Sequence, residues 1–184
     1  MEANISNNFR ILSNGTSKSG EAILNFIHEN FEKAIPKTCN RLLVIGVQGE
    51  DKSGKSSALN NFYQFLTGDI KKLFNENYIE DNNRGASIAY ISYDNLSSEI
   101  KQLSSFSSNY DIVLIESEGF INQSLTTKLL EIYILLCSVF HLNVRKNSLS
   151  LLDQTATDLL NSSNGLLNNL KKRICPLVLF FTRT

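Results

Sequence analysis

The chain has 184 residues, enough for one domain, and 42% of them are hydrophobic, which excludes a wholly disordered protein. Because 18 basic side chains balance 18 acidic ones, the formal charge is zero, and we expect no nucleic-acid partner. The longest apolar run, Ile132–Phe140, is too short to cross a bilayer, and residues 1–8 lack the apolar centre of a signal peptide. We therefore expect one cytoplasmic domain over residues 1–184 with no membrane span.

The first half of the chain alternates strand-like and helix-like patterns. A short strand is predicted at Phe9–Leu12, followed by a helix over Ser19–Phe31, where apolar side chains recur at helical spacing. The continuous apolar run Leu42–Val47 is typical of a strand covered on both faces. A helix is expected over Gly54–Phe65, and residues 69–85 are polar and predicted to form a switch-like loop.

The second half continues the alternation. Strands are predicted at Ile88–Tyr93, near a sheet edge, and at Asp111–Ile115, which is apolar enough to be buried. Helices are predicted over Thr126–His141 and 152–170, and Leu177–Phe181 is expected to be a central strand buried on both faces. This order predicts an α/β doubly wound fold, with three layers and a mostly parallel central sheet flanked by helices.

One segment carries recognisable chemistry. Gly49–Ser56 fits the pattern GxxxxGK[ST] at every fixed position, with a predicted strand before it and a predicted helix after it. In such a loop, glycines let the backbone approach phosphate oxygens, and the free N–H groups form an anion site at the helix N-terminus. Lys55 supplies a positive charge for the β- and γ-phosphates, and Ser56 offers a hydroxyl to Mg²⁺. The residues expected to bind nucleotide here are Gly49, Glu50, Asp51, Lys52, Ser53, Gly54, Lys55, Ser56 and Ser57.

A loop of this kind needs a second acidic group on the metal side, usually at the end of a neighbouring buried strand. Glu116 follows Asp111–Ile115 directly and is the candidate. Taken alone, Glu116 and Glu118 would be more simply explained as a solvated turn at a strand end. The phosphate loop reverses that preference, and Ser56 and Glu116 become the predicted Mg²⁺ ligands.

Several segments in order resemble the large GTPases of the guanylate-binding protein and atlastin type, in the dynamin superfamily. They are the phosphate loop, Glu116-Ser117-Glu118-Gly119 in the place of that family's Asp-Thr-Glu-Gly switch, a predicted helix over Ile132–Asn143, and residues 151–159. The resemblance covers about residues 8–184. It implies the three-layer fold of P-loop NTPases, with GTP and Mg²⁺ as ligands. It further implies pairing of two copies through the nucleotide face, a nucleotide contact at Gly119, and catalytic roles for Lys52 and Glu118.

The departures from the family pattern concern the chemistry. Lys52 stands where the family has an arginine finger, and Lys lacks the planar fork of Arg, so weaker transition-state stabilisation is expected. The first-switch Thr has no counterpart, since Asn83 stands at the best match. The guanine-reading Arg-Asp pair is matched by Arg183-Thr184, in which the carboxylate is missing. We expect the chain to represent an N-terminal part of such a domain or a shortened relative.

Three functions remain open at this point. The first is GTP binding with slow hydrolysis, the second a nucleotide-binding scaffold without turnover, and the third an ATPase of another P-loop family. Lys52, Asn83, Glu116 and Thr184 favour the second, and the imperfect guanine reader allows the third.

Overall fold

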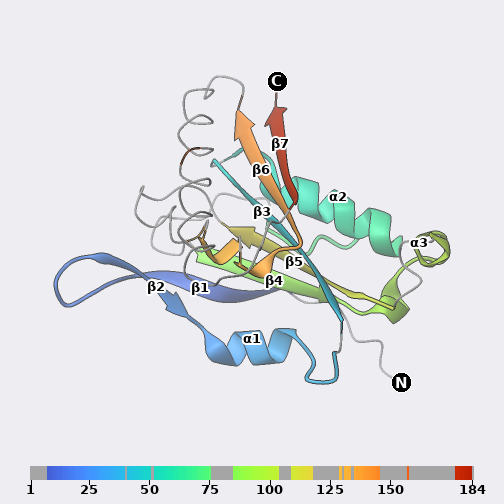
Figure 1. Ribbon diagram of the computed structural model, residues 1–184, viewed down its shortest axis with the longest axis horizontal. Helices are drawn as coiled ribbons and strands as arrows, with labels where there is room; N and C mark the ends of the chain where they lie inside the picture. The colour runs from blue at the N-terminus through green and yellow to red at the C-terminus, as the bar shows by residue number, and fades with distance from the viewer. Residues whose placement is uncertain are drawn as a thin grey trace.

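The computed structural model describes residues 8–39, 41–50, 52–75, 85–103, 109–117, 129, 131–133, 135–145, 157 and 177–183 (Figure 1). Its strands are β1 (Asn8–Thr16), β2 (Ala22–Phe26), β3 (Leu42–Gly49), β4 (Gly85–Ile91), β5 (Asp111–Ser117), β6 (Val139–Arg145) and β7 (Leu177–Arg183). They form one seven-stranded sheet in the order β2-β1-β4-β5-β3-β6-β7. The predicted strands at 42–47, 111–115 and 177–181 therefore lie in one sheet, as expected.

The sheet is mixed rather than mostly parallel. β5, β3, β6 and β7 are parallel to one another, whereas the pairs β1–β2, β1–β4 and β4–β5 are antiparallel. The α/β class is confirmed, but the sequence did not predict the hairpin that supplies two of the antiparallel strands. β4 also lies between β1 and β5 rather than near an edge. Its side chains are buried on both faces of the sheet, Ala86 and Ile88 in one hydrophobic cluster and Ala89 and Ile91 in the other, and all four are at most 1% exposed.

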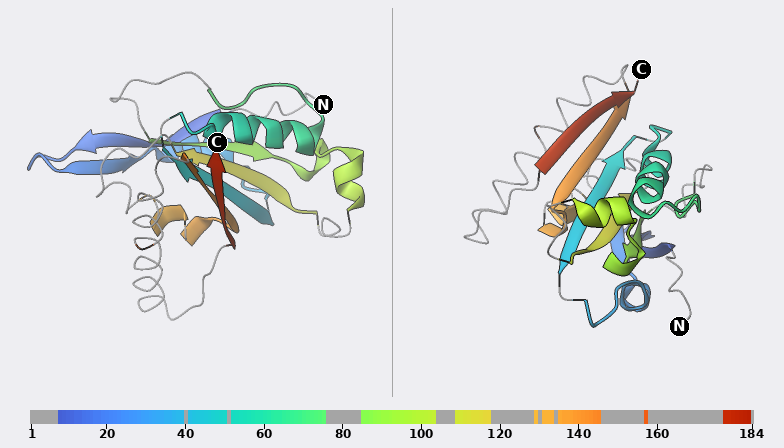
Figure 2. Two further views of the ribbon diagram at one scale, coloured as in Figure 1. Left: turned by 90° about the horizontal axis from the view of Figure 1, so that it is seen from above. Right: turned by 90° about the vertical axis from the view of Figure 1, so that its right-hand side faces the viewer.

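Helices lie on both faces of this sheet (Figure 2). They are α1 (His28–Ala34), α2 (Lys55–Thr67), α3 (Ser98–Gln102), the short 3₁₀ helix η2 (Tyr93–Asn95) and helical residues at 129, 131–133, 135 and 136. In the part of the chain that the structure describes, no helix is long and apolar enough to cross a membrane.

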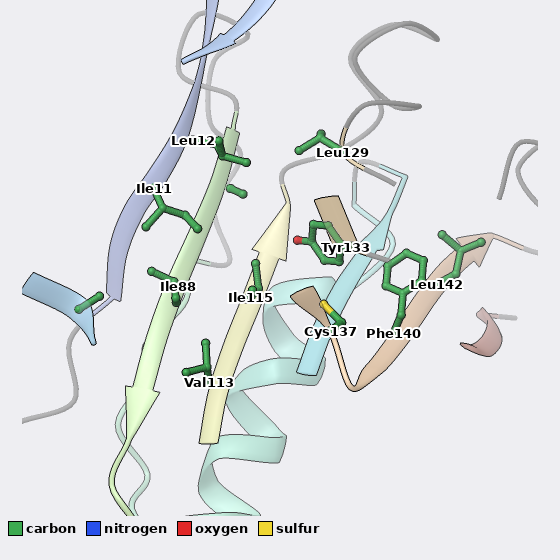
Figure 3. Close-up of a cluster of buried hydrophobic side chains, with 12 residues drawn as sticks. Ile11, Leu12, Ile88, Val113, Ile115, Leu129, Tyr133, Cys137, Phe140 and Leu142 are labelled. Carbon is green, nitrogen blue, oxygen red and sulfur yellow. The ribbon is translucent and has the colours of Figure 1, made fainter. Parts of the chain in front are cut away.

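Two hydrophobic clusters fill the space between the layers. On one face, Leu59, Tyr63 and Leu66 of α2 pack with alternate residues of β3, β4 and β5, including Val47 and Leu114. On the other face, the cluster drawn in Figure 3 joins Leu129, Tyr133 and Cys137 to β1, β4, β5 and β6. Gly46 of β3 lies under this second cluster, where a Cβ would collide with Tyr133 and Cys137.

The predicted helix at 54–65 is confirmed as α2, and two glycines set its ends. Gly54 precedes the helix with a left-handed backbone (φ 86°), and Gly68 follows it with φ 76°, donating its N–H to the Gln64 carbonyl at 2.7 Å. Buried Leu59, Tyr63 and Leu66 recur at the spacing that a helix requires for one face. Burial against the sheet therefore holds α2 directly behind the loop that follows β3.

The predicted helix over residues 19–31 is wrong. Its first part is β2, paired with β1 in a hairpin, and α1 begins only at His28. The hairpin turn uses Gly20 at φ 84°, and the Ser17 N–H donates to the Glu21 carbonyl at 2.8 Å. The hairpin therefore replaces the early part of that helix, and β1 continues to Thr16, beyond the predicted strand end at Leu12.

The predicted helix over residues 126–141 is wrong at its C-terminal end, because the chain is extended from Val139 onward as β6. Within the described residues, β7 pairs only with β6 and lies at the sheet edge, so the prediction of a central strand at 177–181 is also wrong. Two predicted segments lie outside the described residues: the helix over 152–170, except for residue 157, and residues 76–84 of the switch-like loop.

Candidate functional site

The loop between β3 and α2 lies where the strand order of the sheet reverses. β3 has parallel neighbours on both sides, β5 on one and β6 on the other. Along the chain, β5 is added on one side of β3 and β6 then on the opposite side. In open α/β sheets, ligands bind at the carboxyl ends of the strands at such a point. The loop leaves the carboxyl end of β3 and is therefore at the position where a ligand is expected.

The backbone of the loop is wound rather than extended. Lys52 has a left-handed conformation (φ 57°) and so does Gly54, and the Ser53 N–H donates to the Glu50 carbonyl at 3.3 Å. A Cβ at Gly49 would collide with the backbone carbonyl of Asn143 on β6. The glycine at 49 is thus required by the close approach of two strands, and the one at 54 by its backbone angle.

Lys55 folds back across this loop. Its ammonium donates a hydrogen bond to the Glu50 carbonyl at 2.7 Å, and the residue is only 6% exposed. Burying an ammonium group is costly unless negative charge or several acceptors surround it. A buried cation at the first turn of a helix, where the helix dipole is also positive, makes this place favourable for an anion.

Ser56 and Glu116 bring α2 and β5 together beside the loop. The Ser56 hydroxyl donates a hydrogen bond to Glu116 Oε1 at 2.6 Å across 60 residues of sequence. Glu116 is 6% exposed, and the parallel register places it opposite Val47, two residues before the end of β3. One hydroxyl and one carboxylate oxygen therefore lie together on the α2 side of the sheet.

Two further polar side chains are buried at the end of β3. Ser53 is 1% exposed and Gln48 is 0% exposed. Neither the Ser53 hydroxyl nor the Gln48 amide has a hydrogen-bond partner among the described residues. Buried polar groups are usually paired, so the loop region contains more hydrogen-bonding capacity than the described part of the protein uses.

The structure unites most, but not all, of the predicted site residues. Gly49, Glu50, Lys52, Ser53, Gly54, Lys55, Ser56, Ser57 and Glu116 are described and belong to the loop, the first turn of α2 and the end of β5. Lys52 is exposed. Arg183 is the last residue of β7, and β7 lies two strands away from β3, so the two strand axes are separated by roughly 10 Å. Asp51, Asn83, Glu118, Gly119 and Thr184 lie outside the described residues, so their predicted roles stay predictions.

Sequence reasoning missed the contribution of β6. Asn143 had been assigned to a predicted helix, but it lies in β6 opposite Gly49, and its amide donates to the Ser53 carbonyl at 3.0 Å. The sequence does hold a signal for this strand, because apolar Phe140 and Leu142 alternate with polar His141 and Asn143. Burial lowers the pKa of His141, so its imidazole is neutral at physiological pH.

No protein-family model matches the chain, and no curated protein matches it significantly. Within the described residues, no group of three or more His, Cys, Asp or Glu side chains could hold a metal ion. A magnesium ion bound together with a nucleotide takes most of its ligands from phosphates and water and only one or two from the protein. The Ser56–Glu116 pair therefore has the donor set of such a site.

Proposed function

We propose that the chain is a P-loop nucleoside triphosphatase domain that binds GTP with Mg²⁺ and hydrolyses it slowly. The proposal includes a P-loop NTPase arrangement of the parallel strands, in which the loop strand β3 lies between the carboxylate strand β5 and β6. It rests on a motif, on the position of that motif in the sheet, and on contacts between the loop and its neighbours.

The observation that carries the proposal is the joining of Gly49–Ser56 to Glu116. The motif predicted a metal-binding hydroxyl at Ser56 and a carboxylate at Glu116, which are far apart in sequence. Their side chains are 2.6 Å apart: Ser56 lies in the first turn of α2, and Glu116 lies near the end of β5, which is parallel to β3. A chance match to the motif would not require a carboxylate at this place.

Mg²⁺ fits this donor pair. Oxygen ligands are those it prefers, and a hydroxyl that donates to a carboxylate can turn its lone pair toward a cation instead. In the proposal, Ser56 holds the ion directly and Glu116 holds it directly or through water. The ion would neutralise phosphate charge, and Lys55 would move from the Glu50 carbonyl to the β- and γ-phosphates.

Slow turnover follows from the residue at position 52. An arginine finger is worth about 10³–10⁵ in rate, and Lys52 provides charge without the bidentate fork. Lys52 is exposed on the loop, with a left-handed backbone. Two copies pairing through the nucleotide face, as the family resemblance implies, would enclose this residue; sedimentation with and without nucleotide tests that part.

Binding is tested by equilibrium titration of the purified chain with fluorescent GTP and ATP, each with and without Mg²⁺. Turnover is tested by measuring phosphate release. Lys55→Ala is expected to weaken Mg²⁺–GTP binding by about 100-fold or more, because it removes the buried cation of the loop. The matched control is Lys33→Ala, which removes an exposed lysine paired with Glu29 on α1. That control should bind as the wild type does.

The outcomes separate the candidates. Binding that survives Lys55→Ala unchanged would place the nucleotide elsewhere and reject the proposal. Lys55-dependent binding without phosphate release would make the chain a nucleotide-binding scaffold, and a preference for ATP would assign it to another P-loop family.

A further inference from the structure

Asn143, near the end of β6, contacts the phosphate loop at both of its ends. Its side-chain amide donates to the Ser53 carbonyl at 3.0 Å, and its backbone carbonyl accepts the Glu50 N–H at 3.3 Å. The register pairs it with Gly49, whose missing side chain permits the approach. Asn143 is 7% exposed and Ser53 is 1% exposed, so the hydrogen bond from the side chain to the Ser53 carbonyl is shielded from water.

These contacts set the direction of peptide groups inside the loop. In a trans peptide, the carbonyl of one residue and the N–H of the next point in opposite directions. Because Asn143 holds the Ser53 carbonyl, the Gly54 N–H must point away from β6. Gly54 directly precedes α2, where N–H groups without intrahelical partners are available to an anion.

The chemistry at this position requires a donor. A carboxylate there would face the Ser53 carbonyl with oxygen against oxygen, and an apolar side chain would leave that carbonyl buried without its partner. The backbone bond from Glu50 does not depend on the side chain at 143. The side-chain amide therefore has a separable role, which is to hold the second half of the loop.

We propose that Asn143 is a positioning residue of the phosphate loop: its carboxamide fixes the Ser53–Gly54 peptide so that the loop is formed before nucleotide arrives. The effect on affinity rests on the proposed function, whereas the effect on loop order does not. A loop that is already ordered binds more tightly because less conformational entropy is lost on binding.

The test compares two isosteric variants. Asn143→Asp removes the donor to Ser53 with almost no change in shape. Asn60→Asp is the matched control, because Asn60 is 5% exposed and its amide donates to the Phe74 carbonyl at 2.9 Å, away from the loop. Asn143→Ala is included as a variant that adds no charge. Each protein is measured for GTP affinity with Mg²⁺ and for amide hydrogen exchange of peptides covering residues 47–58 and 70–75.

In Asn143→Asp and Asn143→Ala, the loop amides should exchange about tenfold faster or more, and GTP should bind about tenfold more weakly. In Asn60→Asp, amide exchange should change in the 70–75 peptide, and GTP affinity should stay within about twofold of the wild type. Unchanged loop exchange in both Asn143 variants would overturn the inference. So would equal losses of GTP affinity in Asn60→Asp and the Asn143 variants, since a general loss of stability would then explain both. A wild type that fails to bind GTP at all, with loop exchange still dependent on Asn143, would reject the proposed function and leave the positioning role intact.

Discussion

The two ends of strand β5 carry two carboxylates with different surroundings. Asp111 begins the strand and Glu116 lies one residue before its end, so the two carboxylates lie at opposite ends of β5. Both contact residues distant in sequence. The comparison separates a carboxylate that holds the fold together from the carboxylate that we propose as a Mg²⁺ ligand.

Asp111 is half-buried and accepts hydrogen bonds from two neighbouring elements, β4 and η2. Its two oxygens accept hydrogen bonds from the Tyr90 hydroxyl and the Tyr93 backbone N–H, each at 2.8 Å. Burial by itself raises the pKa of Asp111, but hydrogen bonds from Cys39, Tyr93 and Tyr90 bring it below the usual value. Burial, followed by the nearby Asp111, raises the pKa of the Cys39 thiol to about 11. A thiol with so high a pKa stays protonated at neutral pH. The two hydrogen bonds to Asp111 tie β4, η2 and β5 together.

Glu116 accepts instead from the Ser56 hydroxyl, whose oxygen keeps lone pairs that can bind a cation. It lies at the carboxyl end of the parallel strands, next to a loop that holds a buried ammonium group. One strand thus joins a structural carboxylate to a candidate metal ligand. Substitutions at the two positions should affect different measurements.

The largest effect is expected from Glu116→Gln. The amide keeps the size of the side chain and one acceptor oxygen but removes the charge that attracts Mg²⁺. The gain in GTP affinity that Mg²⁺ produces should fall by about 100-fold, measured by titration in Mg²⁺ and in EDTA. Asp111→Asn is the control at the other end of β5 and should keep the full Mg²⁺ effect. Equal Mg²⁺ dependence in wild type and Glu116→Gln would remove Glu116 from the site.

The next effect is on stability. Asp111→Ala should lower the free energy of unfolding by about 2 kcal/mol, because the Tyr93 N–H and the Tyr90 hydroxyl both lose their acceptor. Tyr90→Phe removes one of these bonds and should cost about 1 kcal/mol. Urea unfolding measures both, and GTP affinity per folded molecule should stay at the wild-type value. A loss of affinity as large as that of Glu116→Gln would end the distinction between the two carboxylates.

The sequence predicted the region around Glu116 better than any other part. The strand β3, the loop and α2 are encoded locally, by a continuous apolar run, a fixed motif and glycines at both helix ends. The place of Glu116 followed from the chemistry that the motif requires. Local signals sufficed here because each is specified within about 15 neighbouring residues.

Elsewhere the local pattern was ambiguous or misleading. Ile23, Phe26, Ile27 and Phe31 fit a helical period, yet pairing with β1 makes the first two part of a strand. Apolar residues before position 139 continued a helical stripe that hid the start of β6, and with it Asn143. Tertiary pairing decided both cases, and single-sequence periodicity does not contain it.

The cluster around Asp111 could not be predicted at all. Its members, Cys39, Tyr90, Tyr93 and Asp111, come from three separate segments of the chain and form no motif. Only the strand register brings Tyr90 beside β5, opposite Val113. A structural network of this kind has no fixed spacing in sequence, in contrast to a phosphate loop.

A smaller effect is expected at Lys52, on the Glu116 side of the comparison. Lys52→Arg should raise the rate of GTP hydrolysis by about tenfold, because the planar guanidinium can contact two phosphate oxygens at once. The matched control is Lys33→Arg on α1, where the lysine is also exposed but lies outside the loop. The measurement is single-turnover phosphate release with saturating enzyme. A rate equal to that of the wild type would mean that Lys52 is not at the finger position or that another group limits hydrolysis.

The smallest effect concerns pH and separates charge from shape at Asp111. Because its folded pKa lies below the usual value, the ionised carboxylate stabilises the folded state above the unfolded pKa of about 3.9, and this contribution is lost as the pH falls through the folded pKa. The difference in unfolding free energy between wild type and Asp111→Asn should therefore be constant from about pH 7 to pH 5 and shrink toward pH 2. Glu29 and Glu99, whose pKa values are also lowered, are present in both proteins and cancel from the difference. Urea unfolding of both proteins at each pH measures the difference in unfolding free energy. If that difference grows on acidification, the carboxylate is not held in its charged form by Tyr90 and Tyr93.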